Sequence, residues 1–134
     1  MPESLPDKVS LDGRILLAED GIDNQKLIAF YLKRAGADVD IASNGLLAIE
    51  LLEKAATQGF RYSLLLTDIQ MPEMDGYALT RYLRQCGDDI PIVALTAHAM
   101  TEDRQKGFEA GCNDYLGKPL DKKILLDVCA KYMR

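Results

Sequence analysis

The sequence has no long apolar run, and its basic residues are outnumbered by its acidic ones. No stretch in its 134 residues approaches the roughly 20 apolar residues of a transmembrane helix, so any membrane attachment has to come from another protein segment. Its 16 lysines and arginines stand against 21 aspartates and glutamates, which gives a formal charge of −5. An acidic chain lacks the electrostatic footprint of a nucleic-acid-binding domain. We therefore expect no direct contact with a membrane or with nucleic acid.

Cysteine and histidine are also scarce. The three cysteines, Cys86, Cys112 and Cys129, show no paired metal-ligand spacing, and the sequence holds one histidine, His98. An odd number of thiols favours a reducing compartment, so we expect a cytoplasmic chain in which the cysteines are small core residues. The sequence therefore argues against a zinc site built on cysteine.

The chain reads as one domain preceded by a short linker. Its length suits one core and is too short for two. Residues 1–13 contain Pro2, Pro6 and Gly13 among polar neighbours, so we assign them to a linker and residues 14–134 to the domain. In the domain, short β-rich runs alternate with longer helical patterns. The runs are residues 15–18, 39–42, 63–67, 92–95 and 114–116.

This alternation predicts five strands and five helices. The segments between strands are long enough for right-handed crossovers, which favours a parallel sheet covered on both faces, a doubly wound α/β fold. Asn44 or Ser43 is placed to cap the second helix, and Asp75 the third. The apolar stripes expected to face the core are Leu27, Ile28, Tyr31, Leu32 and Ala35 in the first helix, and Ile124, Leu125, Val128, Cys129 and Tyr132 in the last.

Three carboxylates follow two of the predicted strands. Asp68 comes after the apolar run 62–67, while Glu19 and Asp20 follow the run 15–18. Because the carboxyl ends of parallel strands meet at one edge, where open α/β sheets place their active sites, we expect the three to lie together. Like charges that lie close together repel one another unless a cation binds between them, and oxygen ligands favour a hard ion such as Mg²⁺.

Two further polar residues fall on the same edge. Thr96 follows the run 92–95, and Lys118 follows the run 114–116. A hard metal, a hydroxyl donor and a lysine describe a site for a transferring phosphoryl group, because the metal and the lysine neutralise its oxygens and the hydroxyl donates to them. A carboxylate oxygen of Asp68 is then the natural nucleophile.

Other classes of phosphate-handling protein fit these residues less well. A haloacid-dehalogenase-like phosphatase needs a second acid two residues after its nucleophile, where this chain has Gln70. A nucleotide or flavin binder needs a glycine-rich or hydroxyl-rich loop after the first strand, whereas residues 19–23 are acidic. Lys118 is not part of a Walker loop, because Cys112 and Pro119 occupy positions that require glycine and serine or threonine.

From Arg14 to Arg134 the chain resembles the receiver domain of two-component response regulators. The resemblance implies a flavodoxin-like α/β fold, a doubly wound five-stranded parallel sheet in the order 2-1-3-4-5 with five helices, and a cis peptide between Lys118 and Pro119. The residues that match the family's motif are the acidic pair Glu19 and Asp20, the phosphoacceptor Asp68, the switch hydroxyl Thr96, the switch aromatic Tyr115 and the invariant lysine Lys118.

The resemblance also implies partners and a cofactor. A histidine kinase or a histidine phosphotransfer protein donates the phosphoryl group to the acceptor aspartate. Mg²⁺ is implied to bind Asp20, Asp68 and the backbone carbonyl of Gln70, and to bind Glu19 through water. Gln70 and His98 are implied to tune the lifetime of the phosphoryl group. The chain is then a phosphoacceptor with self-catalysed phosphotransfer and autodephosphorylation, and it is not a kinase by itself.

Three segments are similar to receivers attached to hybrid sensor histidine kinases: residues 68–76, residues 23–25 and residues 96–100. We therefore expect the receiver of a hybrid kinase, which is cytoplasmic but tethered where the kinase is membrane-bound. A stand-alone single-domain response regulator would carry the same residues, and this alternative stays open. So does a pseudo-receiver that binds partners without phosphorylation, although the full set of site residues does not argue for it.

Overall fold

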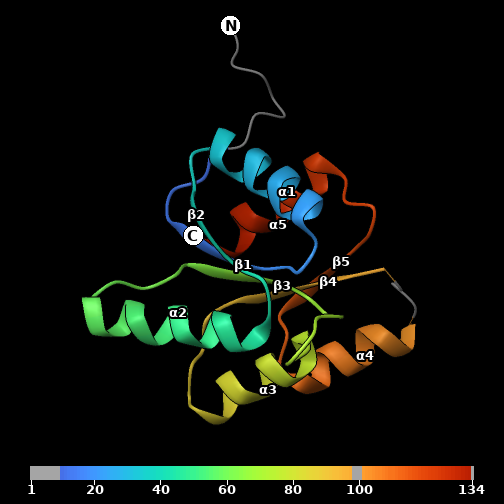
Figure 1. The fold of residues 1–134 in the computed structure, drawn as a ribbon. Helices are drawn as coiled ribbons and strands as arrows, with labels where there is room; N and C mark the ends of the chain where they lie inside the picture. The colour runs from blue at the N-terminus through green and yellow to red at the C-terminus, as the bar shows by residue number, and fades with distance from the viewer. Residues whose placement is uncertain (1–9, 98–100, 134) are drawn as a thin grey trace, which may run out of the picture.

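The computed structural model describes residues 10–97 and 101–133, which form a parallel sheet between two layers of helices (Figure 1). The five strands are hydrogen-bonded in the order β2-β1-β3-β4-β5, and every neighbouring pair is parallel. The predicted doubly wound α/β fold with the order 2-1-3-4-5 is confirmed. In chain order the elements are β1 (Arg14–Ala18), α1 (Ile22–Arg34), β2 (Asp38–Ala42), α2 (Gly45–Gln58), β3 (Leu64–Asp68), α3 (Gly76–Gln85), β4 (Ile92–Thr96), α4 (Thr101–Ala110), β5 (Asp114–Gly117) and α5 (Lys122–Tyr132).

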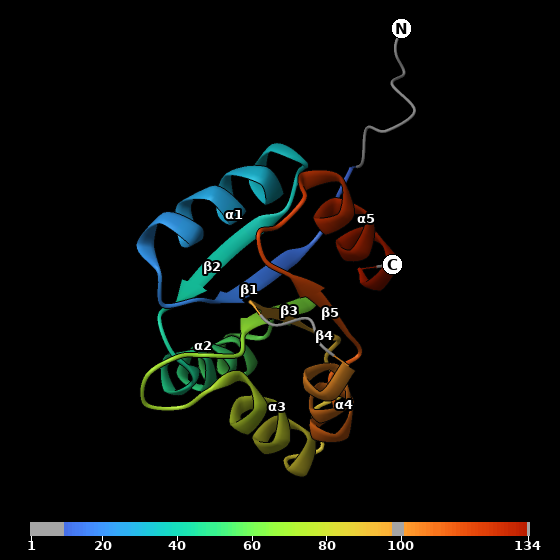
Figure 2. The ribbon, with the colours of Figure 1, turned by 90° about the vertical axis from the view of Figure 1, so that its right-hand side faces the viewer.

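The sheet is buried on both faces. Helices α1 and α5 cover one face, and α2, α3 and α4 cover the other (Figures 1 and 2). Because side chains alternate along a strand, Ile15 and Leu17 of β1 pack toward α1 and α5, whereas Leu16 and Ala18 pack on the opposite side. Double coverage explains why the strands read as continuous apolar runs in the sequence.

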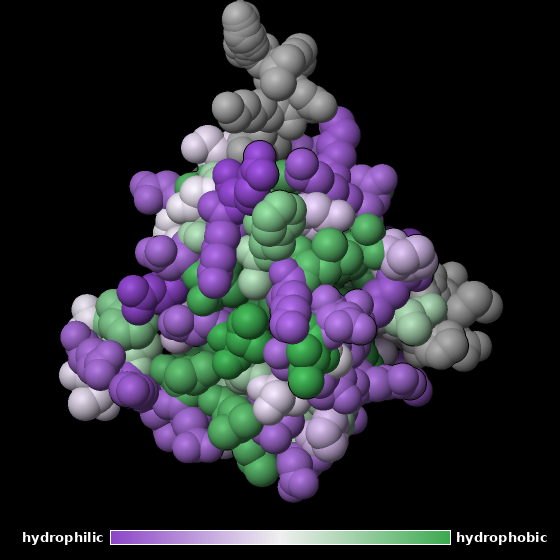
Figure 3. All heavy atoms as spheres, turned by 45° about the horizontal axis from the view of Figure 1, so that its top comes forward, coloured by the Kyte–Doolittle hydropathy of each residue, from purple (hydrophilic) through white to green (hydrophobic). Residues whose placement is uncertain are grey.

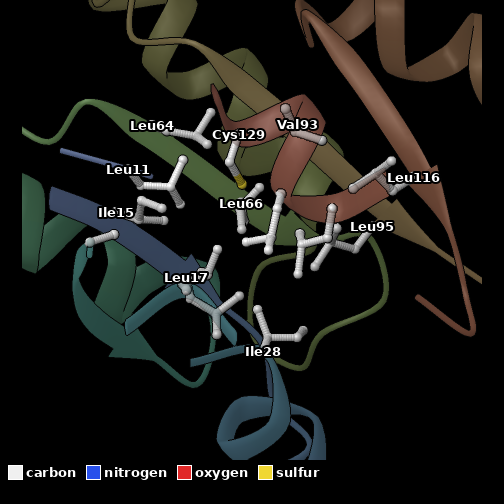
Figure 4. Close-up of a cluster of buried hydrophobic side chains, with 14 residues drawn as sticks. Leu11, Ile15, Leu17, Ile28, Leu64, Leu66, Val93, Leu95, Leu116 and Cys129 are labelled. Carbon is white, nitrogen blue, oxygen red and sulfur yellow. The ribbon is translucent and has the colours of Figure 1, made fainter. Parts of the chain in front are cut away.

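The cluster beneath α1 and α5 (Figure 4) joins side chains from four strands to both helices. Leu11, which precedes the first strand, belongs to it, and the Leu11 N–H donates to the carbonyl of Ala35 at 2.7 Å. The last described residues before β1 are therefore attached to the domain. The labelled members of the cluster are Leu11, Ile15, Leu17, Ile28, Leu64, Leu66, Val93, Leu95, Leu116 and Cys129.

The predicted helix stripes are wrong at their edges. Leu27 is 47% exposed and Ile124 is 53% exposed, whereas Ala29 and Leu126, which the stripes omitted, are buried. Successive helix residues point about 100° apart, so the choice between two adjacent apolar residues depends on how the helix is rotated against the sheet. Over the described residues, none of the helices has both the length and the apolar composition required to cross a bilayer.

The cysteine prediction is correct for two of three residues. Cys112 and Cys129 are buried, as expected of small core residues, and burial raises the pKa of both thiols. Cys86 is exposed at the end of α3, so its assignment to the core is wrong. Cys86 directly follows an amphipathic helix, and the local sequence pattern does not determine whether a residue at that position faces the core or the solvent.

Two predicted helix caps are present. The side chain of Asn44 accepts a hydrogen bond from the N–H of Leu47 at 2.9 Å, and that of Asp75 accepts from the N–H of Ala78 at 2.8 Å. The residue after Asn44 begins α2 and the residue after Asp75 begins α3, as expected for N-cap residues. Asp75 thus has the capping role that its position before Gly76 indicated.

Candidate functional site

The candidate site lies at the carboxyl edge of the sheet, where four strands deliver their last residues. Asp68 is the final residue of β3 and Thr96 the final residue of β4, each one position beyond the predicted run. Glu19 and Asp20 follow β1, and Lys118 follows β5. The parallel register pairs Asp68 with Leu95 and Thr96 with Gly117, so these strand ends are level with one another. The predicted gathering of these residues is confirmed.

Lys118 joins two of the carboxylates directly. Its Nζ donates to Oδ2 of Asp68 at 3.0 Å and to Oε1 of Glu19 at 3.1 Å. The side chain of Glu19 is 1% exposed, that of Asp68 9% and that of Lys118 21%, so solvent and salt screen these ion pairs only weakly. The peptide bond between Lys118 and Pro119 is cis, as the resemblance implied.

The ion pairs shift the pKa of both Lys118 and Glu19. Burial lowers the pKa of Lys118, but the hydrogen bonds and the negative charges of Asp68 and Glu19 outweigh burial and leave it above its ordinary value. Burial is also the main influence on Glu19 and raises its pKa; the charge of Asp68 adds to this, while the Gly21 N–H and Lys118 oppose it. The lysine therefore stays charged and keeps both acids compatible with burial.

The three carboxylates suit a divalent cation. One oxygen from each of Glu19, Asp20 and Asp68 lies within 4.8 Å of the other two. Hard oxygen donors of this kind would hold a divalent cation such as Mg²⁺. Both oxygens of Glu19 already accept hydrogen bonds, from Lys118 and from the Gly21 N–H at 2.9 Å. Glu19 is thus more fully engaged than Asp20, which is exposed, and than Asp68, which is buried and accepts from Lys118 through one oxygen.

An open cleft of about 560 Å³ borders the acidic cluster. Besides Asp20, it is lined by Ile69, Gln70, Met71, Asp75 and Tyr77. Gln70 is exposed, two residues after Asp68, at the position that the resemblance assigns to tuning and to a carbonyl ligand. The cleft leaves the acidic cluster accessible to a donor group from solvent.

The start of α3 is pressed against the backbone of Asp68. The N–H of Gly76 donates to the carbonyl of Ile69 at 2.8 Å. A Cβ atom at Gly76 would lie 2.4 Å from the carbonyl oxygen of Asp68, which no side chain can accommodate without a shift. Gly76 therefore permits the close turn that returns the chain from the site to α3.

The two predicted switch residues lie on adjacent strands. Thr96 is buried, and its carbonyl accepts a hydrogen bond from the N–H of Lys118 at 2.8 Å. Tyr115 is half-buried against α4: its ring stands perpendicular to that of Phe108 at 6.2 Å between centroids, and the guanidinium carbon of Arg104 lies 4.3 Å from the Tyr115 ring centroid. The remaining candidate, His98, lies outside the described residues.

One contact of the site has no counterpart in the residue roles read from the sequence. The side-chain Nε2 of Gln25 donates to the backbone carbonyl of Glu19 at 2.6 Å. Residues 23–25 drew attention only through their resemblance to hybrid-kinase receivers. The sequence signal for this contact is an amide near the start of the helix that follows the acidic pair, but local sequence does not determine where such a side chain points.

Comparison with known proteins assigns the chain to a family. The model of the response regulator receiver domain matches residues 15–130. Hybrid signal transduction histidine kinase I of Dictyostelium discoideum is 40% identical over 119 residues, which cover 86% of this chain and 7% of the kinase. Sensor protein EvgS of Escherichia coli K12 is 42% identical over 124 residues, 92% of this chain and 10% of that protein. The chain thus spans a small part of the length of these relatives.

One relative has nearly the length of this chain. A 14.6 kDa protein of Leptolyngbya boryana, named as uncharacterized, is 40% identical over 120 residues, which cover 88% of both chains. Among solved structures, the receiver domain of the sensor histidine kinase PA1611 from Pseudomonas aeruginosa superimposes with a TM-score of 0.76 and 36% identity, over 90% of this chain and 97% of that one. That receiver carries a magnesium ion coordinated in its active-site cleft.

We expect Lys118→Met to lower the free energy of unfolding by about 1–3 kcal/mol at pH 7 without Mg²⁺, because it leaves two buried carboxylates without their cation. The loss should shrink as the pH falls through the pKa of Glu19, since a protonated acid no longer needs the lysine. Urea unfolding at a series of pH values from about 4 to about 8 measures both effects, because this range begins near the ordinary pKa of a carboxylate and extends above it.

Lys123→Met is the matched control, because Lys123 pairs with Asp127 at 3.1 Å on the exposed surface of α5. Its loss should stay within about 0.5 kcal/mol. Equal losses for the two lysine variants at pH 7 would contradict the structural importance of the buried contacts.

Proposed function

Because this chain belongs to the response-regulator receiver family, we propose that it accepts a phosphoryl group from a phosphohistidine on Asp68 and thereby changes a surface that a partner reads. Receiver domains of this family act in two-component signalling with histidine kinases or histidine phosphotransfer proteins. The observation that carries the proposal is the contact of Lys118 with Asp68 at the edge of the sheet, beside the acidic cluster.

In the proposed step, an oxygen of Asp68 attacks the phosphorus of the donor. The bond between phosphorus and the donor imidazole nitrogen breaks, its electron pair stays on that nitrogen, and a bond forms between phosphorus and the Asp68 oxygen. Lys118 already contacts Oδ2 of Asp68, so its charge lies where the oxygens of the arriving group gather. The hydroxyl of Thr96 donates to one of those oxygens.

The residues present fit a magnesium site. Mg²⁺ bound there neutralises phosphoryl oxygens. We assign Asp20, Asp68 and the backbone carbonyl of Gln70 as direct ligands and Glu19 as a ligand through water. The hydrogen bonds that both Glu19 oxygens accept support the indirect role, and the hard-oxygen chemistry of the set supports magnesium.

The acyl phosphate on Asp68 is a mixed anhydride, so water can remove the phosphoryl group and return the carboxylate. Gln70, which lines the cleft, and His98 are assigned to tuning the access of that water. The domain is therefore a phosphoacceptor with self-catalysed transfer and autodephosphorylation. It contributes no kinase activity by itself.

Signalling follows from the charge change. The phosphoryl group gives Thr96 and Lys118 new acceptor oxygens, and we assign the response to the segment that connects their two strands. Tyr115, whose ring contacts Arg104 and Phe108 of α4, is the switch aromatic and turns inward when Thr96 moves toward the phosphoryl group. The surface of α4 and β5 is then the surface that a partner protein recognises.

The donor is assigned to a histidine kinase or a histidine phosphotransfer protein. Apolar side chains interrupted by polar ones are visible on the face in Figure 3. Exposed apolar residues of the helix that follows the acidic pair include Ile22, 64% exposed, Leu27 and Phe30. Exposed apolar side chains on a helix beside the reactive group offer a surface on which a donor protein can dock, so we assign donor docking to α1.

We assign the chain to the receiver of a hybrid sensor histidine kinase, in the cytoplasm and tethered where its kinase is membrane-bound. The identities of 40–42% to hybrid kinase I and EvgS support this origin. The Leptolyngbya protein, matched over 88% of its own length, supports the alternative of a stand-alone response regulator. The coding region on either side of residues 1–134 distinguishes the two, because a hybrid kinase encodes a histidine kinase core in the same reading frame.

Acetyl phosphate with Mg²⁺ should add one phosphoryl group to the protein, and Asp68→Asn should abolish the gain. Asp75→Asn is the matched control, because Asp75 lines the same cleft but caps α3, a role that asparagine also fills. Intact mass with and without Mg²⁺ measures the gain. No gain in the wild type, with acetyl phosphate and with a phosphohistidine donor, would favour a pseudo-receiver.

Gln70→Ala and His98→Ala should change the decay rate of the aspartyl phosphate by several-fold, as expected for one hydrogen bond near the reacting atoms. Urea unfolding of the same variants should stay within about 0.5 kcal/mol of the wild type, since Gln70 is exposed. Decay is followed by intact mass after the donor is removed. Unchanged decay in both variants would show that neither residue tunes the site.

Beryllofluoride, a phosphoryl mimic, should shift amide resonances across residues 96–118 in the presence of Mg²⁺. Tyr115→Ala should retain the shifts next to Asp68 and lose those of α4, because its ring packs on Phe108 of that helix. Two-dimensional amide NMR makes the comparison. Identical spectra with and without beryllofluoride over this range would refute the two-state switch.

A further inference from the structure

The peptide unit between Glu19 and Asp20 determines where the most exposed carboxylate of the site lies. A peptide is planar, so fixing the carbonyl of Glu19 also fixes the direction in which the chain leaves toward the Cα of Asp20. Before this unit, the N–H of Glu19 donates to the carbonyl of Ala42 on β2 at 2.9 Å. After it comes Gly21, whose lack of a side chain gives the backbone more freedom than any other residue would.

Gln25 fastens this peptide unit from the other side. Its Nε2 donates to the carbonyl oxygen of Glu19 at 2.6 Å, and its own N–H donates to the carbonyl of Gly21 at 2.9 Å as the first turn of α1 forms. Gln25 is half-buried, so water competes less for this contact than on an open surface. One helix residue therefore holds the backbone on both sides of Asp20.

This contact is not an ordinary helix cap. A capping side chain accepts from the orphan N–H groups at the start of a helix, as the side chain of Glu19 does from the N–H of Gly21, the N-cap residue of α1. Gln25 instead donates to a carbonyl that precedes the helix. The bond therefore satisfies none of the N–H groups of α1. Instead it restrains the loop that carries the acidic pair.

We propose that Gln25 is a positioning residue for the divalent cation: by fixing the peptide unit between Glu19 and Asp20, it holds the Asp20 carboxylate at the distance from Asp68 that a shared cation needs. Glu19 is anchored independently, by Lys118 and by the Gly21 N–H. Asp20 is exposed and follows the backbone. This inference rests on the proposed magnesium-dependent phosphoacceptor function.

The test uses Gln25→Ala and Gln25→Met, the second of which keeps the length of the side chain but cannot donate a hydrogen bond. Thr57→Ala is the matched control. The Thr57 hydroxyl donates to the carbonyl of Glu53 at 3.0 Å on α2, so this substitution also removes one side-chain donor from a backbone carbonyl. Mg²⁺ binding to the unphosphorylated protein is measured by titration calorimetry, stability by urea unfolding without metal, and phosphorylation by acetyl phosphate over a range of Mg²⁺ concentrations.

Both Gln25 variants should bind Mg²⁺ about fivefold more weakly than the wild type, the factor expected for one hydrogen bond, while Thr57→Ala binds as the wild type does. The Mg²⁺ concentration that gives half the maximal phosphorylation rate should rise by the same factor, and saturating Mg²⁺ should restore the maximal rate.

Three results would overturn the inference, and they differ in whether the proposed function fails with it. If the wild type binds Mg²⁺ and is phosphorylated but the Gln25 variants bind equally tightly, the inference fails and the proposed function stands. If the variants lose stability well beyond Thr57→Ala and a lower maximal rate persists at saturating Mg²⁺, Gln25 has a structural role. If the wild type binds no Mg²⁺, the inference and the magnesium-dependent function fail together.

Discussion

The contact of Lys118 with Asp68 and Glu19 is the interaction on which the rest of the site depends. Two carboxylates this close and this buried cost stability unless a cation offsets their charge, and the lysine supplies that cation from 50 and 99 residues away in the chain. The lysine can reach them only because β5 lies at one end of a sheet whose other strands end level with it. Fold and site therefore depend on each other.

Burying the sheet on both faces leaves its carboxyl edge as the place for chemistry. The strand interiors are almost wholly apolar, and polar groups are concentrated at the last residue of each strand or just beyond it. There they reach solvent without exposing the core, as in other open α/β sheets. The close approach of Gly76 to the carbonyl of Asp68 then turns the chain back beneath the sheet and leaves a cleft beside the acids.

Local pattern predicted the elements well and their rotation less well. The strand runs were placed within one residue because unbroken apolar segments between turn residues leave little choice. Leu27 and Ile124 were assigned to the core although they are exposed, because each has an apolar neighbour that competes for the same face. Only the packing of α1 and α5 against the sheet selects between them. Cys86 was also assigned to the core although it is exposed.

The sequence by itself determined the fold class, the strand order through its family resemblance, and the set of residues at the strand ends: Glu19, Asp20, Asp68, Thr96 and Lys118. These follow from apolar periodicity and from residue type, which are local properties. The tertiary structure alone decided that Lys118 bridges two acids, that both oxygens of Glu19 are engaged, and that the Gln25 side chain reaches back to the carbonyl of Glu19. Such contacts depend on the direction in which the packed strands and helices point each side chain, and the spacing of residues along the chain does not determine that direction.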